Sequence, residues 1–211
     1  MNVNQTSCTL LTMCSVPILS TKIELSNKNE FMEYIKGLKY VSSVPEQNNY
    51  TELTDEMRLL SKDVSKELFY KIEEFFKFYK NELYRYDETS FKMVNSWATK
   101  TRPNLESKDY HRHCNSMFTG VYYPEISENS GKLIFNQRNV REIYVQSSAP
   151  TEYNTESLEI SPETDLLILF PSYLYHKIGI NNSGFDRYSI AFNYMPIGTV
   201  GSRDTRITYN F

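Results

Sequence analysis

The spacing of hydrophobic residues changes near residue 88 of the chain. Before that point, apolar side chains recur every three or four positions, which is the period of a helix packed on one face. The spacing predicts helices over Ser26–Tyr40 and Lys62–Tyr84, and the second carries an aromatic stripe typical of core packing. Ser26 also has the chemistry of a capping residue. We expect these helices to support one face of a sheet.

After residue 90 the pattern turns to short apolar runs separated by polar or Gly/Pro turns, which is typical of strands. The predicted strands are Lys92–Thr99, His111–Tyr123, Gly131–Asn136, Arg141–Gln146, Asp165–Phe170 and Arg187–Pro196. Strands with flanking helices are typical of a jelly roll. We therefore expect a mainly β single domain over 1–211. Its jelly-roll core covers 88–211, and an N-terminal strand and supporting helices cover 1–87.

Composition narrows the class of protein. The formal net charge of −3 argues against a dedicated nucleic-acid or membrane surface, and no apolar run is long enough to span a membrane. The start of the chain lacks a convincing secretory signal. Cys8, Cys14 and Cys114 are odd in number and lack metal-binding spacing, which favours a reducing compartment. These features predict a cytoplasmic protein.

Histidine placement is the strongest chemical signal in the chain. Of the three histidines, His111 and His113 are one residue apart, and His176 lies far downstream. If the first segment is extended, residues two apart face the same way, so both imidazoles can approach one ion while Cys114 faces away. Imidazole is the commonest metal ligand at neutral pH, and three protein ligands leave positions open for chemistry. The spacing therefore predicts a metal site.

A candidate anion site follows on the last predicted strand. Arg187 and Ser189 come shortly after His176 and face the same way on a strand. A guanidinium beside a hydroxyl is a good receptor for a carboxylate. Asn193 lies on the same face and is expected to point toward the metal or the substrate. Asn95 and Trp97 share a face that could line the opposite wall, although core packing is an equal interpretation for Trp97.

Several short segments, taken in order and spacing, resemble one known family. The matching segments are Asn95-Ser96-Trp97, His111-Arg112-His113-Cys114-Asn115-Ser116, Thr119-Gly120-Val121-Tyr122-Tyr123, Leu169-Phe170-Pro171-Ser172-Tyr173-Leu174-Tyr175-His176 and Arg187-Tyr188-Ser189-Ile190-Ala191-Phe192-Asn193. The stretch Asn95–Gly198 is similar to the double-stranded β-helix core of iron(II)- and 2-oxoglutarate-dependent oxygenases. It resembles most a group common in marine phages and bacteria, and prolyl hydroxylases more distantly.

The resemblance implies a reaction and its cofactors. Iron(II) would be held by the three histidines, with 2-oxoglutarate as cosubstrate. The far carboxylate of 2-oxoglutarate would reach Arg187 and Ser189, with Tyr123 as a third donor. The enzyme would use O2 to hydroxylate a C–H bond of a protein side chain, an amino acid or a small metabolite, releasing succinate and CO2. Its compartment would be the cytoplasm, or the host cytoplasm if the chain is phage-encoded, and a homodimer stays open.

One position departs from the family pattern, and alternatives stay open. Most such oxygenases have His-x-Asp or His-x-Glu, whereas His113 occupies the carboxylate position here. Pairing Asp109 with His111 would restore a carboxylate ligand. Two other functions are also open. One is a three-histidine iron dioxygenase that does not use 2-oxoglutarate, in which Arg187 binds the substrate's own carboxylate. The other is a non-catalytic jelly roll with a binding or structural role.

Overall fold

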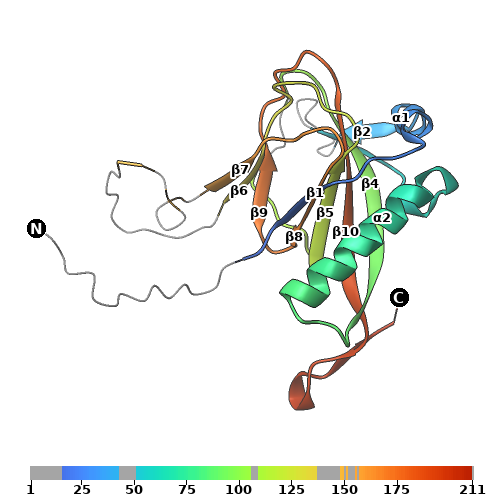
Figure 1. Cartoon of the computed structure of the whole chain (residues 1–211), viewed down its shortest axis with the longest axis vertical. Helices are drawn as coiled ribbons and strands as arrows, with labels where there is room; N and C mark the ends of the chain where they lie inside the picture. The colour runs from blue at the N-terminus through green and yellow to red at the C-terminus, as the bar shows by residue number, and fades with distance from the viewer. Residues whose placement is uncertain are drawn as a thin grey trace, which may run out of the picture.

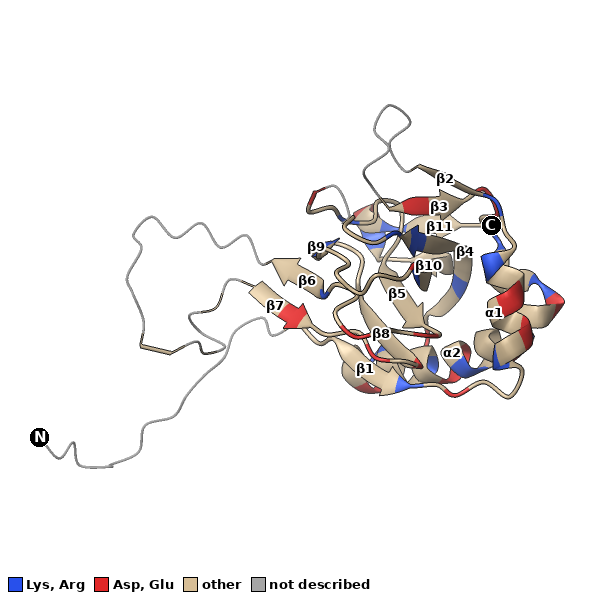
Figure 2. Cartoon of the chain, turned by 90° about the horizontal axis from the view of Figure 1, so that it is seen from above, with Lys and Arg blue, Asp and Glu red and all other residues tan. Residues whose placement is uncertain are grey.

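A computed structural model of the protein describes residues 16–42, 51–105, 109–136, 148–149, 151, 155 and 157–210. Two antiparallel sheets pack against each other, and the helices cover the outer face of the larger sheet (Figures 1 and 2). This architecture is the expected double-stranded β-helix with helical support. The predicted strand Arg141–Gln146 lies outside the described residues.

The larger sheet has eight strands in the order β1-β8-β5-β10-β4-β3-β2, with β11 paired to β10, and the smaller has the order β7-β6-β9. Strand bounds are β1 (Leu19–Lys22), β2 (Tyr40–Ser42), β3 (Glu52–Thr54), β4 (Ser90–Thr101), β5 (Phe118–Tyr123), β6 (Leu133–Asn136), β7 (Ser157–Ile160), β8 (Leu166–Pro171), β9 (Tyr175–Ile178), β10 (Arg187–Val200) and β11 (Ile207–Tyr209). The predicted strands in the regions of β4, β6, β8 and β10 are confirmed, with ends that differ by a few residues.

Both predicted helices are present, and both are shorter than the hydrophobic pattern suggested. Helix α1 (Lys28–Lys36) ends at Gly37, and Tyr40 already begins strand β2. Helix α2 (Lys66–Phe78) is flanked by turns of other helical types. These are the 3-10 turns η1 (Leu59–Ser61) and η2 (Asp63–Ser65) before it and the π-helical turn η3 (Tyr79–Leu83) after it. A further 3-10 turn, η4 (Arg203–Thr205), precedes β11.

Alternation along the central strands builds two separate cores. On β10, Ile190, Phe192 and Tyr194 face the helices, and the ring of Phe76 from α2 stacks on Tyr194 at 3.6 Å between centroids. The opposite faces of β5 and β8 meet the smaller sheet in a second cluster. Its buried members are Tyr123, Leu133, Phe135, Leu166, Ile168, Phe170 and Leu174. The inner face of β10 is left for polar side chains.

Close packing on the helix side explains a glycine in the middle of β5. A Cβ at Gly120 would lie 2.2 Å from the ring of Phe192 and 2.7 Å from a methyl carbon of Leu169. Both contacts are far inside van der Waals distance, so the large side chains on the neighbouring strands β10 and β8 require a glycine between them.

The predicted strand His111–Tyr123 is wrong in its first half. Regular pairing begins only at Phe118; before it, His111 makes an isolated bridge to His176, and Asn115 has a positive φ of 55°. The amide of His113 donates to the carbonyl of Ser172 at 3.0 Å, which holds the segment against the end of β8. The irregular backbone is satisfied by these separate contacts rather than by a ladder.

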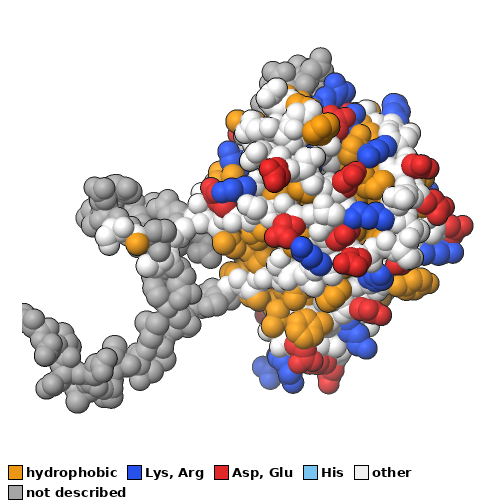
Figure 3. Space-filling view, turned by 45° about the horizontal axis from the view of Figure 1, so that its top comes forward, with side chains coloured by type: hydrophobic (Ala, Val, Ile, Leu, Met, Phe, Trp, Pro, Cys, Tyr) orange, Lys and Arg blue, Asp and Glu red, His pale blue; other side chains and the backbone are white. Residues whose placement is uncertain are grey.

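Acidic and basic side chains are interspersed over the face of the molecule shown in Figure 3, as the small net charge of −3 would suggest. Among the described residues, none of the helices combines the length and the apolar character that crossing a membrane requires.

Candidate metal centre

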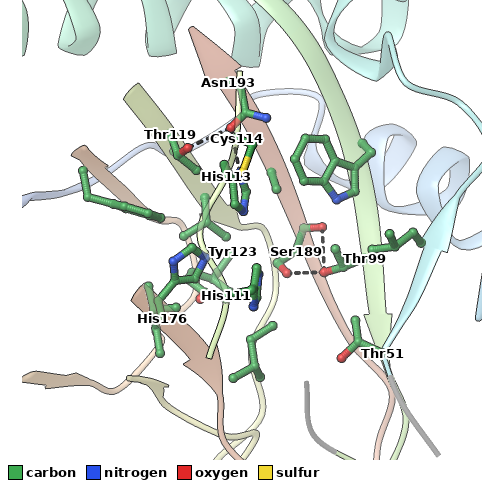
Figure 4. Close-up of a pocket in the computed structure, with 18 of the residues that line it drawn as sticks. Thr51, Thr99, His111, His113, Cys114, Thr119, Tyr123, His176, Ser189 and Asn193 are labelled. Carbon is green, nitrogen blue, oxygen red and sulfur yellow. Dashed lines mark hydrogen bonds between the residues drawn. The ribbon is translucent and has the colours of Figure 1, made fainter. Parts of the chain in front are cut away.

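A cavity of about 480 Å³ opens between the two sheets, and every histidine of the chain lines it (Figure 4). Its walls come mainly from β4, β5, β9 and β10 and from the irregular segment before β5. The described lining residues are Thr51, Leu53, Trp97, Thr99, Asp109, His111, His113, Cys114, Thr119, Gly120, Val121, Tyr123, Leu133, Phe170, His176, Ile178, Ser189, Ala191 and Asn193.

The three imidazoles converge on one point. His111, His113 and His176 each offer a ring nitrogen, and these nitrogens all lie within 4.8 Å of one another. Ring centroids are 4.5 Å apart for His111 and His176 and 5.1 Å apart for His113 and His176. Such a group can close around one divalent ion, because Zn–N and related bonds are about 2.0 to 2.1 Å long. Among the described residues, no carboxylate belongs to this group.

The main-chain contacts that bring the histidines together were not predicted from the sequence. His111 and His176 exchange two main-chain hydrogen bonds, of 3.0 and 2.9 Å, across their isolated bridge. His176 itself is held in β9, where it pairs with Phe135 of β6. His113 reaches the same point from the irregular segment, and not through strand alternation. Cys114, which we expected to face away from the metal, lines the same cavity but contributes no atom to the converging group.

Each imidazole has an acceptor at its Nδ1 atom. Nδ1 of His111 lies 3.2 Å from the carbonyl oxygen of Asp109, and Nδ1 of His176 lies 2.9 Å from that of Leu174. Nδ1 of His113 lies 2.7 Å from Oδ1 of Asn193. A ring that donates from Nδ1 keeps its lone pair on Nε2, and such partners fix the orientation of metal-binding histidines.

Burial keeps two of the imidazoles neutral. His176 is 5% exposed, and burial, reinforced by the neighbouring His111 and His113, lowers its pKa to about 3. Burial also lowers the pKa of His113, while the contact with Asn193 opposes that shift. At neutral pH these two rings are therefore unprotonated and can donate a lone pair to a cation.

Asp109 does not take part as a ligand in this geometry. Its side chain is exposed and lines the cavity, and its main-chain oxygen, rather than its carboxylate, faces the ring of His111. The group of converging ligand atoms contains His113 and lacks Asp109. The geometry therefore favours the three-histidine assignment over the pairing of Asp109 with His111.

Arg187 is buried next to the cavity, and no acidic side chain in the part of the chain that the structure describes pairs with it. It is 2% exposed, and its guanidinium donates long hydrogen bonds of 3.3 Å to the carbonyls of Ser130 and Gly131 and of 3.4 Å to the hydroxyl of Thr101. Among the described residues, its Nε has no hydrogen-bond partner. Burial lowers the pKa of Arg187, as expected for a cation removed from water. The ring of Tyr123 lies 5.7 Å from its Cζ.

The expected neighbours of Arg187 line the cavity itself. Ser189 is on the inner face of β10, and its hydroxyl lies 2.6 Å from that of Thr99 on β4. Tyr123 lines the cavity as well. Sequence reasoning missed Thr99 and the turn at Ser130 and Gly131. Thr99 could have been found from its β4 register, because it pairs directly with Ser189, but the turn carries no such signal.

Asn193 lies at the opposite end of the same strand face, beside the metal group rather than beside Arg187. Its Oδ1 accepts from Thr119 at 2.8 Å as well as facing His113, and its Nδ2 donates to Asn95 at 2.8 Å. Trp97 lines the cavity, with its ring 5.6 Å from that of His113. The expectation that Trp97 lines the cavity wall is confirmed. Asn95 is not among the described lining residues and instead accepts a hydrogen bond from Asn193.

Fold and site together define a double-stranded β-helix with a three-histidine centre for a metal ion. Residues 95–193 match the sequence model of a family described as "Putative 2OG-Fe(II) oxygenase", and the matched segment contains the three histidines, Arg187 and Asn193. The match covers a little under half of the chain. A comparison with curated proteins gives no match.

Solved structures of this class share the fold across most of their length. A prolyl hydroxylase from Trichoplax adhaerens, in complex with a hypoxia-inducible-factor peptide, has 14% identity and a TM-score of 0.59, with 84% of this chain and 83% of that chain covered. A Pseudomonas putida prolyl-4-hydroxylase has 10% identity and a TM-score of 0.59, covering 85% and 92%. HygX from Streptomyces hygroscopicus, with nickel, 2-oxoglutarate and hygromycin B bound, has 12% identity and a TM-score of 0.54, covering 86% and 83%.

Proposed function

We propose that the protein is an iron(II)- and 2-oxoglutarate-dependent oxygenase that hydroxylates a C–H bond of its substrate. The observation that carries the proposal is a group of three histidines that line the cavity, together with a buried arginine next to it. Three imidazoles converge in the cavity. The guanidinium of Arg187, which has no counter-ion among the described residues, lies 5.7 Å from the ring of Tyr123 and two residues before Ser189 on β10. The likeness to oxygenases of marine phages and bacteria, and a cytoplasmic location, belong to the same proposal.

The ligand set suits a divalent transition metal. Imidazole nitrogen is a borderline ligand that binds iron(II), nickel(II) and zinc(II), and three such ligands leave open coordination positions. His111, His113 and His176 would hold the ion, which when bound supplies the redox chemistry for oxygen activation and for decarboxylation of 2-oxoglutarate. Because none of the three ligands is charged, the bound ion would keep its double positive charge until an anion joins it.

The anion pocket suits a carboxylate. Burying a guanidinium without a counter-ion is costly, and the orphaned Nε of Arg187 leaves the cation incompletely satisfied. The hydrogen bonds that hold it are long, so a carboxylate offers a better partner than the carbonyls of Ser130 and Gly131 do. Arg187 would neutralise the far carboxylate of 2-oxoglutarate, while the hydroxyls of Ser189 and Tyr123 donate to it.

The rest of the cavity limits the kind of group that enters for oxidation. Its remaining walls include Leu53, Trp97 and Ile178, and Asp109 is the only carboxylate among the described lining residues. An apolar wall with one acidic side chain favours an uncharged or cationic group over a second anion. We expect a protein side chain, an amino acid or a small metabolite that presents such a group.

Formation of succinate tests the proposed reaction. The purified protein with iron(II), O2 and 2-oxoglutarate is expected to release succinate slowly, because many such reactions run to some extent without the second substrate; Arg187→Ala and His176→Ala serve as matched controls. Stoichiometric iron binding without succinate from any substrate tried would favour the three-histidine dioxygenase that does not use 2-oxoglutarate. Failure to bind iron at all would favour the non-catalytic jelly roll.

The uncharged ligand set predicts coupled binding of metal and cosubstrate. 2-Oxoglutarate should tighten iron(II) binding by at least ~10-fold and, by linkage, iron(II) should tighten 2-oxoglutarate by the same factor. His113→Asp supplies a negative ligand, so the coupling should shrink several-fold in this variant. Anaerobic calorimetric titrations in both orders measure it. Equal coupling in the two proteins would mean that His113 is not a ligand or that ligand charge has no role.

A further inference from the structure

A chain of side-chain hydrogen bonds runs from His113 across the end of the cavity. Asn193 Oδ1 lies 2.7 Å from Nδ1 of His113 and accepts from the hydroxyl of Thr119 at 2.8 Å. The Thr119 hydroxyl lies 2.8 Å from that of Ser172, which in turn accepts from Ser116 at 2.7 Å. Figure 4 shows Asn193, Thr119 and His113 converging beside Cys114. Each member has a partner, so the orientation of one side chain depends on the next.

The acceptor at His113 differs in kind from those at the other two histidines. His111 and His176 face main-chain carbonyl oxygens, which can only accept a hydrogen bond. Those two rings must therefore donate from Nδ1, whatever the side chains around them. His113 faces the amide of Asn193, which has an accepting and a donating end. The tautomer of His113 therefore depends on which end of that amide faces the ring.

The contacts on the far side of Asn193 select its accepting end. Its Nδ2 donates to Oδ1 of Asn95, so its Oδ1 is the end that faces His113 and Thr119. Asn95 and Asn193 are paired residues on β4 and β10, and the register between the strands shifts just beyond them. Such an irregularity next to a site re-aims the side chains beside it. The pair is thus fixed by the sheet and presents an acceptor to His113.

We infer that Asn193, held by Asn95 and Thr119, is a positioning residue that selects the Nδ1–H tautomer of His113 and so leaves its Nε2 lone pair for the metal. This inference rests on the proposed metal site, but the expected tautomer of His113 also applies to the metal-free protein. It assigns Asn193 a role toward a ligand rather than contact with 2-oxoglutarate or the substrate. His113 stands in the position where most such oxygenases have a carboxylate. Of the three ligands, it is the one whose tautomer is set by a side chain.

Two near-isosteric substitutions separate positioning from packing. Asn193→Leu fills the same space without an acceptor, whereas Asn193→Asp keeps an oxygen facing Nδ1. The first readout is ¹⁵N NMR of the imidazoles in the metal-free protein above pH 7. With three histidines in the chain, single histidine variants assign each ring. The second readout is the dissociation constant for iron(II) or cobalt(II), measured anaerobically, with melting temperature as the folding control.

In the wild type and in Asn193→Asp, His113 is expected to show a protonated Nδ1 and an unprotonated Nε2. In Asn193→Leu the ring should lose that preference, and metal affinity should fall by ~10- to 100-fold, the usual range for a partner of a ligating histidine. Asn193→Asp should restore affinity to within a few-fold of the wild type. A wild-type His113 protonated at Nε2, or an Asn193→Leu variant with unchanged tautomer and affinity, would overturn the inference. If the expected tautomers appear but no metal binds, the proposed function fails and the positioning role stands.

Discussion

Replacing His176 with alanine is expected to abolish stoichiometric iron(II) binding. His176 is the most deeply buried of the three imidazoles, and its lowered pKa of about 3 keeps it a neutral lone-pair donor through the whole neutral range. Loss of one of three ligands should reduce affinity by well over the ~100-fold that bounds the effect of a ligand's partner. Anaerobic calorimetry with iron(II) and no cosubstrate measures it directly.

The matched control for this experiment is Asp109→Ala. Asp109 lines the same cavity, but it contributes no atom to the converging group, so its removal should change iron(II) affinity by less than about three-fold. His113→Ala should behave like His176→Ala. The three-histidine assignment would be wrong if Asp109→Ala destroyed binding while His113→Ala left it intact, and the carboxylate pairing with His111 would then replace it.

The second large effect concerns Arg187→Ala, which should raise the dissociation constant of 2-oxoglutarate by roughly two to three orders of magnitude. Removing one partner of a buried ion pair costs ~3 to 5 kcal/mol, and each tenfold change in affinity corresponds to about 1.4 kcal/mol. Arg187 is 2% exposed, so the pair that it would form with the carboxylate is largely shielded from bulk water. Calorimetry of the iron-loaded protein under anaerobic conditions measures the change.

Ser189→Ala is the control against which the loss of 2-oxoglutarate affinity in Arg187→Ala is compared. It removes one neutral donor on the same strand face and should cost about 1 kcal/mol. Arg187→Lys keeps the charge but not the two-pronged geometry, so its affinity should lie between those of Arg187→Ala and the wild type. Unchanged 2-oxoglutarate affinity in Arg187→Ala would remove this residue from the site and, with it, the main support for a cosubstrate carboxylate.

Much of the fold could be predicted because its signals are local. The aromatic stripe of α2 and the alternation on β10 each record which face of an element is buried, and both are confirmed. The short strands β1, β7, β9 and β11 carry three or four residues each, too few for a period to stand out. Their existence depends on partners far along the chain, such as β8 for β1. A single sequence does not display those partners.

The candidate site was recognised from residue types more than from geometry. The three histidines and Arg187 were singled out by their scarcity and order, and the structure brings the histidines together. The predicted strand conformation around the first two histidines was wrong, because the segment from His111 to Met117 is irregular. Its contacts with Ser172 and Tyr194 join distant parts of the chain, and no local pattern encodes them.

The bridge between His111 and His176 gives a bound ion a second physical role. These residues are 65 positions apart in the sequence and lie side by side through two main-chain hydrogen bonds. An ion shared by their rings would act as a removable cross-link that closes a long loop. A cross-link that closes a longer loop removes more entropy from the unfolded chain, although this stabilisation rises only slowly with loop length. Metal depletion would therefore remove a cross-link between the segment before β5 and strand β9. The protein would then lose stability against unfolding as well as activity.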